Sequence, residues 1–293
     1  MKNALFTGVC TALVTPFLDG RVNYPMVEQL LRRQMDAGID TIVLSGTTGE
    51  APTLSDEEKI EMLHVAKEFT GNNCTIIAGT GSNSTAHAIQ MSQAAEEAGA
   101  DGLLVVSPYY NKATPEGLFA HYLSIANAVH IPIILYNVPS RTGVDIPVSV
   151  YQRLSGISNI VGVKEAGSDI TKITKIRCAC GDHFAVWSGN DDMTVPTIAL
   201  GGKGVISVVS NVCPGQMAAM ANAALAGDFD TAAALQTHLQ PLSELLFSAV
   251  NPIPVKAAMK LIGYDCGGCR LPLTGLNKEL RDRLAACLTG YLQ

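Results

Sequence analysis

Lys164 is the residue whose surroundings in this sequence point most clearly to chemistry. It follows the apolar run Ile160-Val-Gly-Val163, at the end of a stretch expected to form a buried strand. Lysine is almost never fully buried unless it is paired or used. Burial disfavours the charged form of an amine, and a neutral amine can attack a carbonyl and form an imine. Taken alone, imine chemistry and a structural lysine paired with Glu165 are both open, although strand alternation points Glu165 to the other side.

Four further polar residues could complete such a site. Tyr136 ends another apolar run, and its phenol could carry protons for a carbinolamine, although an isolated tyrosine more often belongs to the core. Thr47 and Thr48 lie in a glycine-bracketed turn whose backbone N–H groups could converge on a carboxylate. Arg141, in a Pro-Ser-Arg-Thr-Gly loop, offers a planar fork for a second carboxylate, or is a solvated loop arginine.

The elements that must position these residues alternate between apolar runs and amphipathic stretches. Most of the runs are continuously apolar, which is typical of strands that are buried on both faces. Eight strands alternating with helices indicate a (β/α)₈ TIM barrel, an α/β fold whose active site lies in the loops after the strands. The expected strands are residues 9–17, 41–44, 75–78, 102–106, 131–136, 160–164, 184–187 and 204–208.

A faint internal repeat favours one barrel over two domains. Residues 35–44, 95–104 and 199–206 resemble one another, and each has a glycine where a helix should end and a strand begin. After residue 226 the pattern changes, and helices are expected without a further strand. We therefore expect a catalytic barrel over residues 1–226 and a small helical C-terminal domain over residues 227–293, with helices at 228–250, 254–263 and 277–293.

The composition excludes several classes of protein. The chain has 293 residues, 47% of them hydrophobic and only 16% charged, which excludes intrinsic disorder and suggests that some surface is covered by subunit contacts. A net charge of −6 argues against a nucleic-acid partner, and no apolar run is long enough to span a membrane. Residues 5–14 only faintly imitate a signal peptide. We expect a cytoplasmic protein whose eight cysteines are reduced.

Other motifs do not indicate a metal or a cofactor. The Gly79-Thr-Gly81 turn has Ser84 where a dinucleotide fingerprint requires glycine, so a nucleotide site is not expected. Cys266 and Cys269 form a single CxxC pair without a second ligand pair nearby, which makes a zinc site improbable. Neither an HExxH motif nor a GxSxG motif is present. The expected chemistry therefore uses side chains alone.

Three segments in order resemble the pyruvate-dependent lyase family: Gly46-Thr-Thr-Gly-Glu50, Tyr136-Asn-Val-Pro139 and Gly162-Val-Lys-Glu165. That family contains N-acetylneuraminate lyase, 2-keto-3-deoxy sugar-acid aldolases and dihydrodipicolinate synthase, and the resemblance covers nearly the whole chain. Two more segments, Pro108-Tyr-Tyr-Asn-Lys112 and Val138-Pro-Ser-Arg-Thr-Gly143, resemble the dihydrodipicolinate synthase branch.

The resemblance implies a reaction and a role for each catalytic residue. Lys164 would form a Schiff base with pyruvate, and the enamine would condense with L-aspartate-4-semialdehyde to give 4-hydroxy-tetrahydrodipicolinate, an intermediate of lysine and diaminopimelate synthesis. Tyr136 would be the general acid/base, linked through Thr47 to Tyr110 of a neighbouring subunit. No cofactor is implied. The partner would be a second copy of the chain, in a homotetramer built as a dimer of dimers.

The resemblance also implies four substrate-binding positions. Thr48 would hold the pyruvate carboxylate, and Arg141 would bind the carboxylate of the semialdehyde. Gly189 and the carbonyl of Ile206 would line the pocket of the lysine. The alternative is a Schiff-base aldolase of the same family that acts on a 2-keto-3-deoxy sugar acid or N-acetylneuraminate, in which Arg141 would be idle. A non-catalytic barrel that binds a keto acid would form no imine.

One region departs from the family pattern. Members inhibited by lysine carry two histidines and a glutamate at positions that correspond here to Asp56, Lys59 and His87, whereas Asn83 and Tyr109 are kept. The loss of the carboxylate removes a partner for the effector's ammonium group, and Lys59 would repel that group. We therefore expect weak or absent feedback inhibition by L-lysine.

Overall fold

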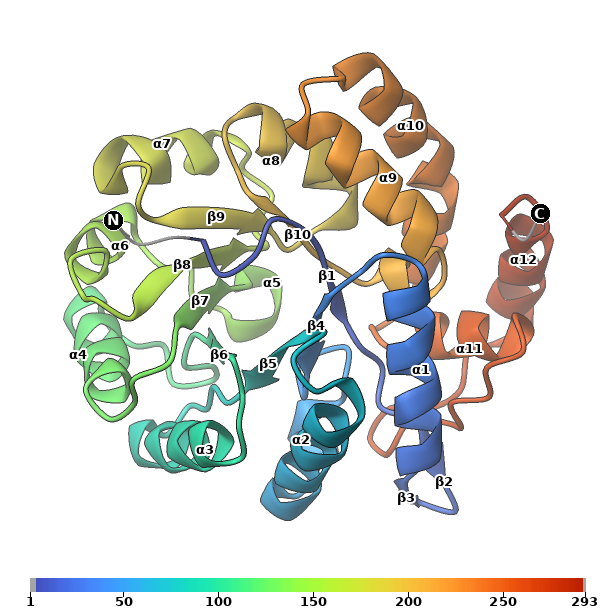
Figure 1. The fold of residues 1–293 in the computed structure, drawn as a ribbon, viewed down its shortest axis with the longest axis horizontal. Coiled ribbons are helices and arrows are strands. Elements are labelled where there is room, and N and C mark those ends of the chain that lie inside the picture. The colour runs from blue at the N-terminus through green and yellow to red at the C-terminus, as the bar shows by residue number, and fades with distance from the viewer. Residues whose placement is uncertain (1–3, 292–293) are drawn as a thin grey trace.

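The computed structural model describes residues 4–291, and within them eight parallel strands close into a barrel (Figure 1). Each strand pairs with the strand before it and the strand after it in the barrel, and the last pairs with the first. The predicted (β/α)₈ fold is confirmed. The barrel strands are β1 (Gly8–Ala12), β4 (Thr41–Leu44), β5 (Thr75–Gly79), β6 (Gly102–Val106), β7 (Ile133–Asn137), β8 (Ile160–Glu165), β9 (Ala185–Ser188) and β10 (Gly204–Ser207).

The first strand is shorter than predicted. The sequence suggested a strand over residues 9–17, but β1 ends at Ala12, and Phe17 belongs to a separate hairpin. The Leu13 amide still donates to the Val43 carbonyl, but the Val14 amide donates to the Asn211 side chain instead, so the pairing ends before Pro16. The hairpin pairs β2 (Phe17–Leu18) with β3 (Arg21–Val22) around Asp19 and Gly20, both at positive φ. The strand predicted at 131–136 likewise begins later, at Ile133.

Helices surround the barrel on its outer side, as the alternating pattern predicts (Figure 1). A capping box begins α2, in which the side chains of Ser55 and Glu58 each accept a hydrogen bond from the other residue's backbone amide. The helices between or after barrel strands are α1 (Tyr24–Asp36), α2 (Asp56–Thr70), α3 (Thr85–Glu97), α4 (Pro115–Ala126), α5 (Pro139–Thr142), α6 (Val148–Leu154), α7 (Thr171–Cys180), α8 (Thr194–Ala199) and α9 (Pro214–Leu225). Three 3₁₀ turns are η1 (Ala51–Thr53), η2 (Asp191–Met193) and η3 (Val209–Asn211).

The repeated helix-to-strand joins have the predicted backbone. Gly38, Gly99 and Gly201 have φ of 80°, 88° and 87°. Only glycine adopts this left-handed region without steric cost, so each glycine ends its helix and turns the chain toward the next strand.

Three helices follow the barrel and cover one side of it, α10 (Phe229–Leu246), α11 (Ile253–Leu261) and α12 (Lys278–Leu288) (Figure 1). Helix α10 packs against α9, and α12 packs against α10 and α11. Within residues 4–291 no strand follows β10, as predicted. None of the described helices combines the length and the apolar character needed to cross a membrane.

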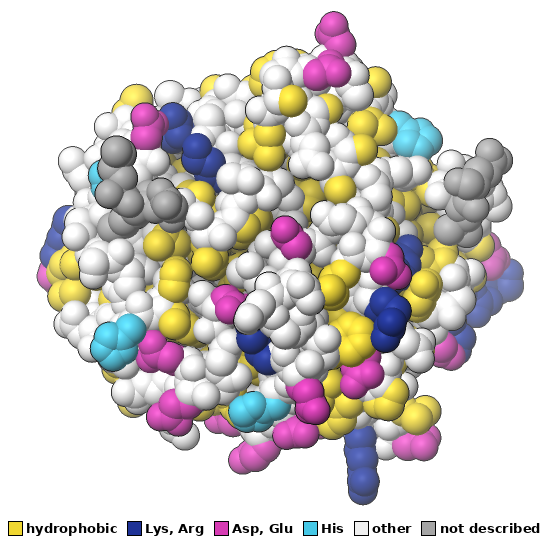
Figure 2. Space-filling view, viewed as in Figure 1, with side chains coloured by type: hydrophobic (Ala, Val, Ile, Leu, Met, Phe, Trp, Pro, Cys, Tyr) yellow, Lys and Arg dark blue, Asp and Glu magenta, His cyan; other side chains and the backbone are white. Residues whose placement is uncertain are grey.

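The buried apolar residues form two clusters. The larger cluster lies between the strands and the helices, and the smaller fills the barrel. Inside the barrel, Phe6 stacks on Trp187 with ring centroids 4.9 Å apart. Tyr136 and Ile206 also belong to this inner cluster, so two residues of the expected site belong to the barrel's own core. On the face shown in Figure 2, basic side chains are scattered among acidic and apolar ones.

Candidate active site

Lys164 and Tyr136 lie side by side on neighbouring strands. They are direct partners in the register of β7 and β8, and the lysine Nζ is 4.4 Å from the centroid of the tyrosine ring. Both side chains are buried, at 5% and 6% exposure. Among residues 4–291, no side chain forms an ion pair with Lys164. The amine therefore remains available to a substrate.

Glu165 is not the partner of Lys164. Its side chain lies on the outer side of β8, where it accepts a hydrogen bond from Tyr151 and forms a 3.4 Å ion pair with Lys172. This is the orientation that strand alternation predicts. The alternative of a structural Lys164–Glu165 pair is therefore wrong.

Two buried acidic groups lie within electrostatic reach of Lys164, and sequence reasoning missed both. Burial raises the pKa of the Cys10 thiol well above its ordinary value, with the nearby Lys164 opposing this in part. Burial also raises the pKa of Asp191, against hydrogen bonds from Ser207 Oγ and the Val208 amide. Asp191 lies in η2, just after Gly189-Asn190. The next residue is also an aspartate, and the sequence alone does not show that Asp191 is buried while its neighbour is exposed.

The threonine turn after β4 is tightly wound. Ser45 and Glu50 have φ of 53° and 57°, and the Glu50 amide donates to the Thr47 carbonyl at 3.1 Å. Thr48 is 2% exposed, and its Oγ1 accepts a 3.0 Å hydrogen bond from Asn251 Nδ2. The side chain of Thr48 is therefore held in place by Asn251, a residue more than two hundred positions later in the sequence.

The C-terminal segment supports this turn from behind. Lys256 on α11 forms a buried 2.8 Å ion pair with Glu50 and donates to the carbonyls of Thr15 and Gly268. Asn251, just before α11, keeps its Oδ1 buried and without a partner in the described part of the chain. Sequence reasoning missed both residues, although an amide and an amine within Asn251-Pro-Ile-Pro-Val-Lys256 are unusual in so apolar a stretch.

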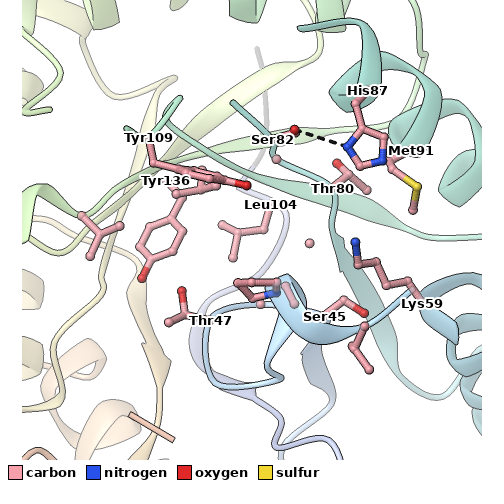
Figure 3. A pocket seen from close by; sticks show the side chains of 18 of the residues that line it. Ser45, Thr47, Lys59, Thr80, Ser82, His87, Met91, Leu104, Tyr109 and Tyr136 are labelled. Carbon is pink, nitrogen blue, oxygen red and sulfur yellow. Dashed lines mark hydrogen bonds between the residues drawn. The ribbon is translucent and has the colours of Figure 1, made fainter. Parts of the chain in front are cut away.

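A cavity of about 440 Å³ opens beside Tyr136 and the threonine turn (Figure 3). Its lining includes Thr47, Tyr136, Arg141, Lys59 and His87, and in Figure 3 Thr47 and Tyr136 lie at one end and Lys59 and His87 at the other. In Figure 3 the hydroxyl of Tyr136 points toward Thr47. Lys164 does not line this cavity, but it lies directly beside Tyr136, which does.

The remaining predicted binding residues are distributed around the barrel end. Arg141 lies on α5, is exposed, and forms no ion pair with any residue from 4 to 291. Gly189 follows β9, and a Cβ there would lie 2.5 Å from Cβ of Ala166, so only glycine fits. Ile206 is fully buried in β10, inside the barrel with Tyr136.

Tyr110 lies apart from the other catalytic candidates. It is 89% exposed, has φ of 71°, and does not line the cavity. A non-glycine residue at this φ is strained and uncommon. Within a single chain the structure therefore does not bring Tyr110 to Tyr136 and Thr47.

The far end of the cavity carries a small charged cluster. His87 Nε2 lies 2.7 Å from Asp56 Oδ2, Lys59 pairs with Asp56 at 3.2 Å, and His87 Nδ1 is 3.3 Å from Ser82 Oγ (Figure 3). Burial alone would raise the pKa of Asp56, but hydrogen bonds from His87 and Lys59 lower it below its ordinary value. Tyr109 lines the same cavity, whereas Asn83 lines a separate one.

The described residues offer no group of three His, Cys, Asp or Glu side chains that could hold a metal ion. Cys266 and Cys269 are free thiols, and so are the other six cysteines.

Comparison with known proteins identifies the family. Residues 5–290 match the sequence profile of the Dihydrodipicolinate synthetase family. The chain belongs to this family. A 4-hydroxy-tetrahydrodipicolinate synthase of Acetivibrio thermocellus is 44% identical over 99% of both chains. The chloride-inhibited dihydrodipicolinate synthase of Acinetobacter baumannii, solved in complex with pyruvate, superposes with a TM-score of 0.96 at 42% identity, covering 98% of this chain and 99% of the other.

Another family structure contains lysine. The dihydrodipicolinate synthase of Cyanidioschyzon merolae, solved with lysine bound, has a TM-score of 0.96 and 38% identity to this chain, covering 99% of this chain and all of the other. Membership of the family agrees with the resemblance of the sequence motifs.

Proposed function

We propose that this protein condenses pyruvate with L-aspartate-4-semialdehyde through a Schiff base on Lys164 and gives 4-hydroxy-tetrahydrodipicolinate. The observation that carries the proposal is the buried amine of Lys164, which has no ion-pair partner among residues 4–291 and lies 4.4 Å from the centroid of the Tyr136 ring. The match to the family from residue 5 to residue 290 supports the assignment of imine formation to this lysine.

In this mechanism the amine of Lys164 attacks the ketone carbon of pyruvate. Tyr136 protonates the ketone oxygen, and loss of one water from the carbinolamine leaves the protonated imine. The imine withdraws electrons from the methyl group, so loss of a methyl proton gives an enamine. The enamine carbon attacks the aldehyde carbon of the semialdehyde, whose oxygen takes a proton and becomes the 4-hydroxyl group. The substrate's own amine then displaces Lys164 as the ring closes.

The other residues would bind the substrates. Thr48 and the backbone amides of its turn would hold the pyruvate carboxylate. The hydrogen bond from Asn251 fixes the position of the Thr48 hydroxyl for this role. Arg141 would bind the carboxylate of the semialdehyde with two parallel hydrogen bonds. Gly189 and the carbonyl of Ile206 would line the pocket of Lys164. The reaction requires neither a metal nor an organic cofactor.

Tyr110 would act on a neighbouring subunit. An exposed tyrosine held at a strained φ of 71° is consistent with a role outside its own chain, where it would complete a proton relay with Thr47 and Tyr136. We therefore propose an obligatory dimer that pairs into a homotetramer. The low charged fraction of 16% supports buried subunit contacts. A cytoplasmic location would keep the eight free thiols reduced.

The decisive assay compares the two candidate reactions in the parent protein and in Arg141→Ala. If the proposal is right, the parent condenses pyruvate with the semialdehyde, and the variant's KM for the semialdehyde rises by about 10- to 100-fold, because a charge-assisted hydrogen bond contributes about 1.5–3 kcal/mol. The KM for pyruvate should change little.

Cleavage of 2-keto-3-deoxy sugar acids or N-acetylneuraminate by the same preparations tests the alternative. If the parent cleaves such a sugar acid, fails to condense the semialdehyde, and is unaffected by Arg141→Ala, the alternative aldolase is correct and the proposal is wrong.

A further inference from the structure

Directly behind the catalytic pair lies a second pair of neighbouring residues. Asn137 follows Tyr136 on β7, and Glu165 follows Lys164 on β8, and the two are register partners just as Tyr136 and Lys164 are. Because strand residues alternate between faces, the second pair points out of the barrel. Asn137 is completely buried and Glu165 is 4% exposed. Asn137 Nδ2 donates a 2.7 Å hydrogen bond to Glu165 Oε1.

The carboxylate of Glu165 is fully engaged on this outer side. Its Oε1 also accepts from the Gly167 amide at 2.8 Å, and its Oε2 accepts from Tyr151 at 3.2 Å and pairs with Lys172 at 3.4 Å. Burial and the Glu165 charge both raise the pKa of Tyr151 well above its ordinary value, so its hydroxyl stays protonated and can donate. Both oxygens of the carboxylate are therefore held by two contacts each.

Asn137 is held just as firmly. Its Oδ1 accepts from the Ile146 amide at 3.0 Å, and its Nδ2 also donates to Asp145 Oδ1 at 2.8 Å. Asp145 in turn binds Lys172, which closes a ring of charged and polar groups across the ends of β7 and β8. The backbone extends this ring to β9, because the Glu165 carbonyl accepts from the Gly189 amide at 2.7 Å.

Stability alone explains such a network poorly. Buried ion pairs contribute little net stability, because desolvation of the charges offsets much of their attraction, and apolar residues of similar volume often serve as well. What the network does supply is a fixed lateral position for two adjacent strand ends. A shift of one residue, or a splay of β7 from β8, would break the Asn137–Glu165 hydrogen bond and would also move the Tyr136 ring away from the amine of Lys164.

We propose that Asn137 and Glu165 are positioning residues, which touch no substrate but hold Lys164 and Tyr136 in the geometry needed for imine formation. The inference rests on the proposed roles of Lys164 and Tyr136. Misplacement of reacting groups by about 1 Å can cost about 100-fold in rate. Loss of the network should therefore slow the chemical step at saturating pyruvate and leave the KM for pyruvate nearly unchanged.

The test measures the rate of imine formation at saturating pyruvate, by borohydride quenching and intact mass, in Glu165→Gln and in a matched control. The control is Glu116→Gln, which makes the same change in an exposed ion pair with Arg153. We expect the rate in Glu165→Gln to fall by about 10- to 100-fold and the control to match the parent. Circular dichroism and thermal unfolding establish that the compared proteins are folded, and rates are expressed per folded molecule.

A milder variant keeps the proposal testable if Glu165→Gln does not fold. Tyr151→Phe removes one hydrogen bond to Glu165 Oε2 and should slow imine formation by about two- to tenfold, the equivalent of a hydrogen bond of about 0.5–1.5 kcal/mol. If the folded variant forms the imine as fast as the parent, the proposal is wrong, whatever happens to its melting temperature. If the parent itself forms no imine, the role of Lys164 fails instead, so the two failures are distinguishable.

Discussion

At the end of the cavity lined by Thr47 and Tyr136, the neighbouring Lys164 forms no ion pair with any residue from 4 to 291, and neither does Arg141, whereas at the other end Lys59 and His87 both bind Asp56. The first end is also backed by buried contacts, including the Glu50–Lys256 pair and the Asn251–Thr48 hydrogen bond. The second end is a partly exposed cluster on the first turns of two helices. Under the proposed function the unpaired basic groups would bind the substrates, while Lys59 and His87 are already paired with Asp56.

The largest effect should come from the tyrosine at the catalytic end. Tyr136→Phe keeps the ring that packs 4.4 Å from Lys164 and removes only the hydroxyl. We expect kcat to fall by about 10²- to 10⁴-fold, the usual contribution of a general acid or base. Steady-state kinetics on folded protein tests this, and a fall of less than about tenfold would show that another group carries the proton.

The next largest effect should come from the buried ion pair of Lys256 and Glu50 behind the threonine turn. Lys256→Met leaves the Glu50 carboxylate buried without its ion-pair partner, so we expect the free energy of unfolding to fall by about 3–5 kcal/mol. The matched change at the other end, Lys59→Met, breaks a part-exposed i,i+3 pair and should cost less than about 1 kcal/mol. Urea denaturation of both variants checks the difference. Equal losses of unfolding free energy would contradict the expected difference between the buried Lys256–Glu50 pair and the part-exposed Lys59–Asp56 pair.

The smallest effect should be the response to L-lysine. At the far end of the cavity, Lys59 repels an ammonium group, and Asp56, the nearby carboxylate, already binds both Lys59 and His87. We therefore expect millimolar L-lysine at neutral pH to leave the condensation rate almost unchanged. An inhibition constant below about 1 mM would show that Asp56 can exchange its partners for the effector, and the proposed contrast would fail.

The alternation of apolar and amphipathic stretches predicted most of the fold. It placed all eight barrel strands, because a strand that is buried on both faces is continuously apolar. It also placed the three C-terminal helices. The boundary of β1 was wrong because the apolar run continues to Phe17, whereas the pairing ends where the Val14 amide donates to the Asn211 side chain. Pro16 is a local signal against a single long strand, but Asn211, which ends the pairing, lies far away in the sequence.

The candidate site was predicted only where a motif lies at the end of a strand. Lys164, Tyr136, Thr47 and Thr48 were proposed in this way, and the structure places them in or just after β4, β7 and β8. Asn251 and Lys256 were missed, because their roles depend on contacts with residues more than two hundred positions earlier in the sequence. Asp191 was missed for a related reason, since only the tertiary fold distinguishes this buried carboxylate from its neighbour at 192.

The central claim is that Lys164 carries the chemistry, and trapping of its imine tests that claim most directly. The protein is incubated with pyruvate, reduced with borohydride, weighed intact and then mapped by peptide mass. We predict one reduced pyruvate adduct per chain, located on Lys164, and none in Lys164→Ala. Folded protein that gains no adduct, or gains it on another buried lysine such as Lys172 or Lys256, would contradict the account.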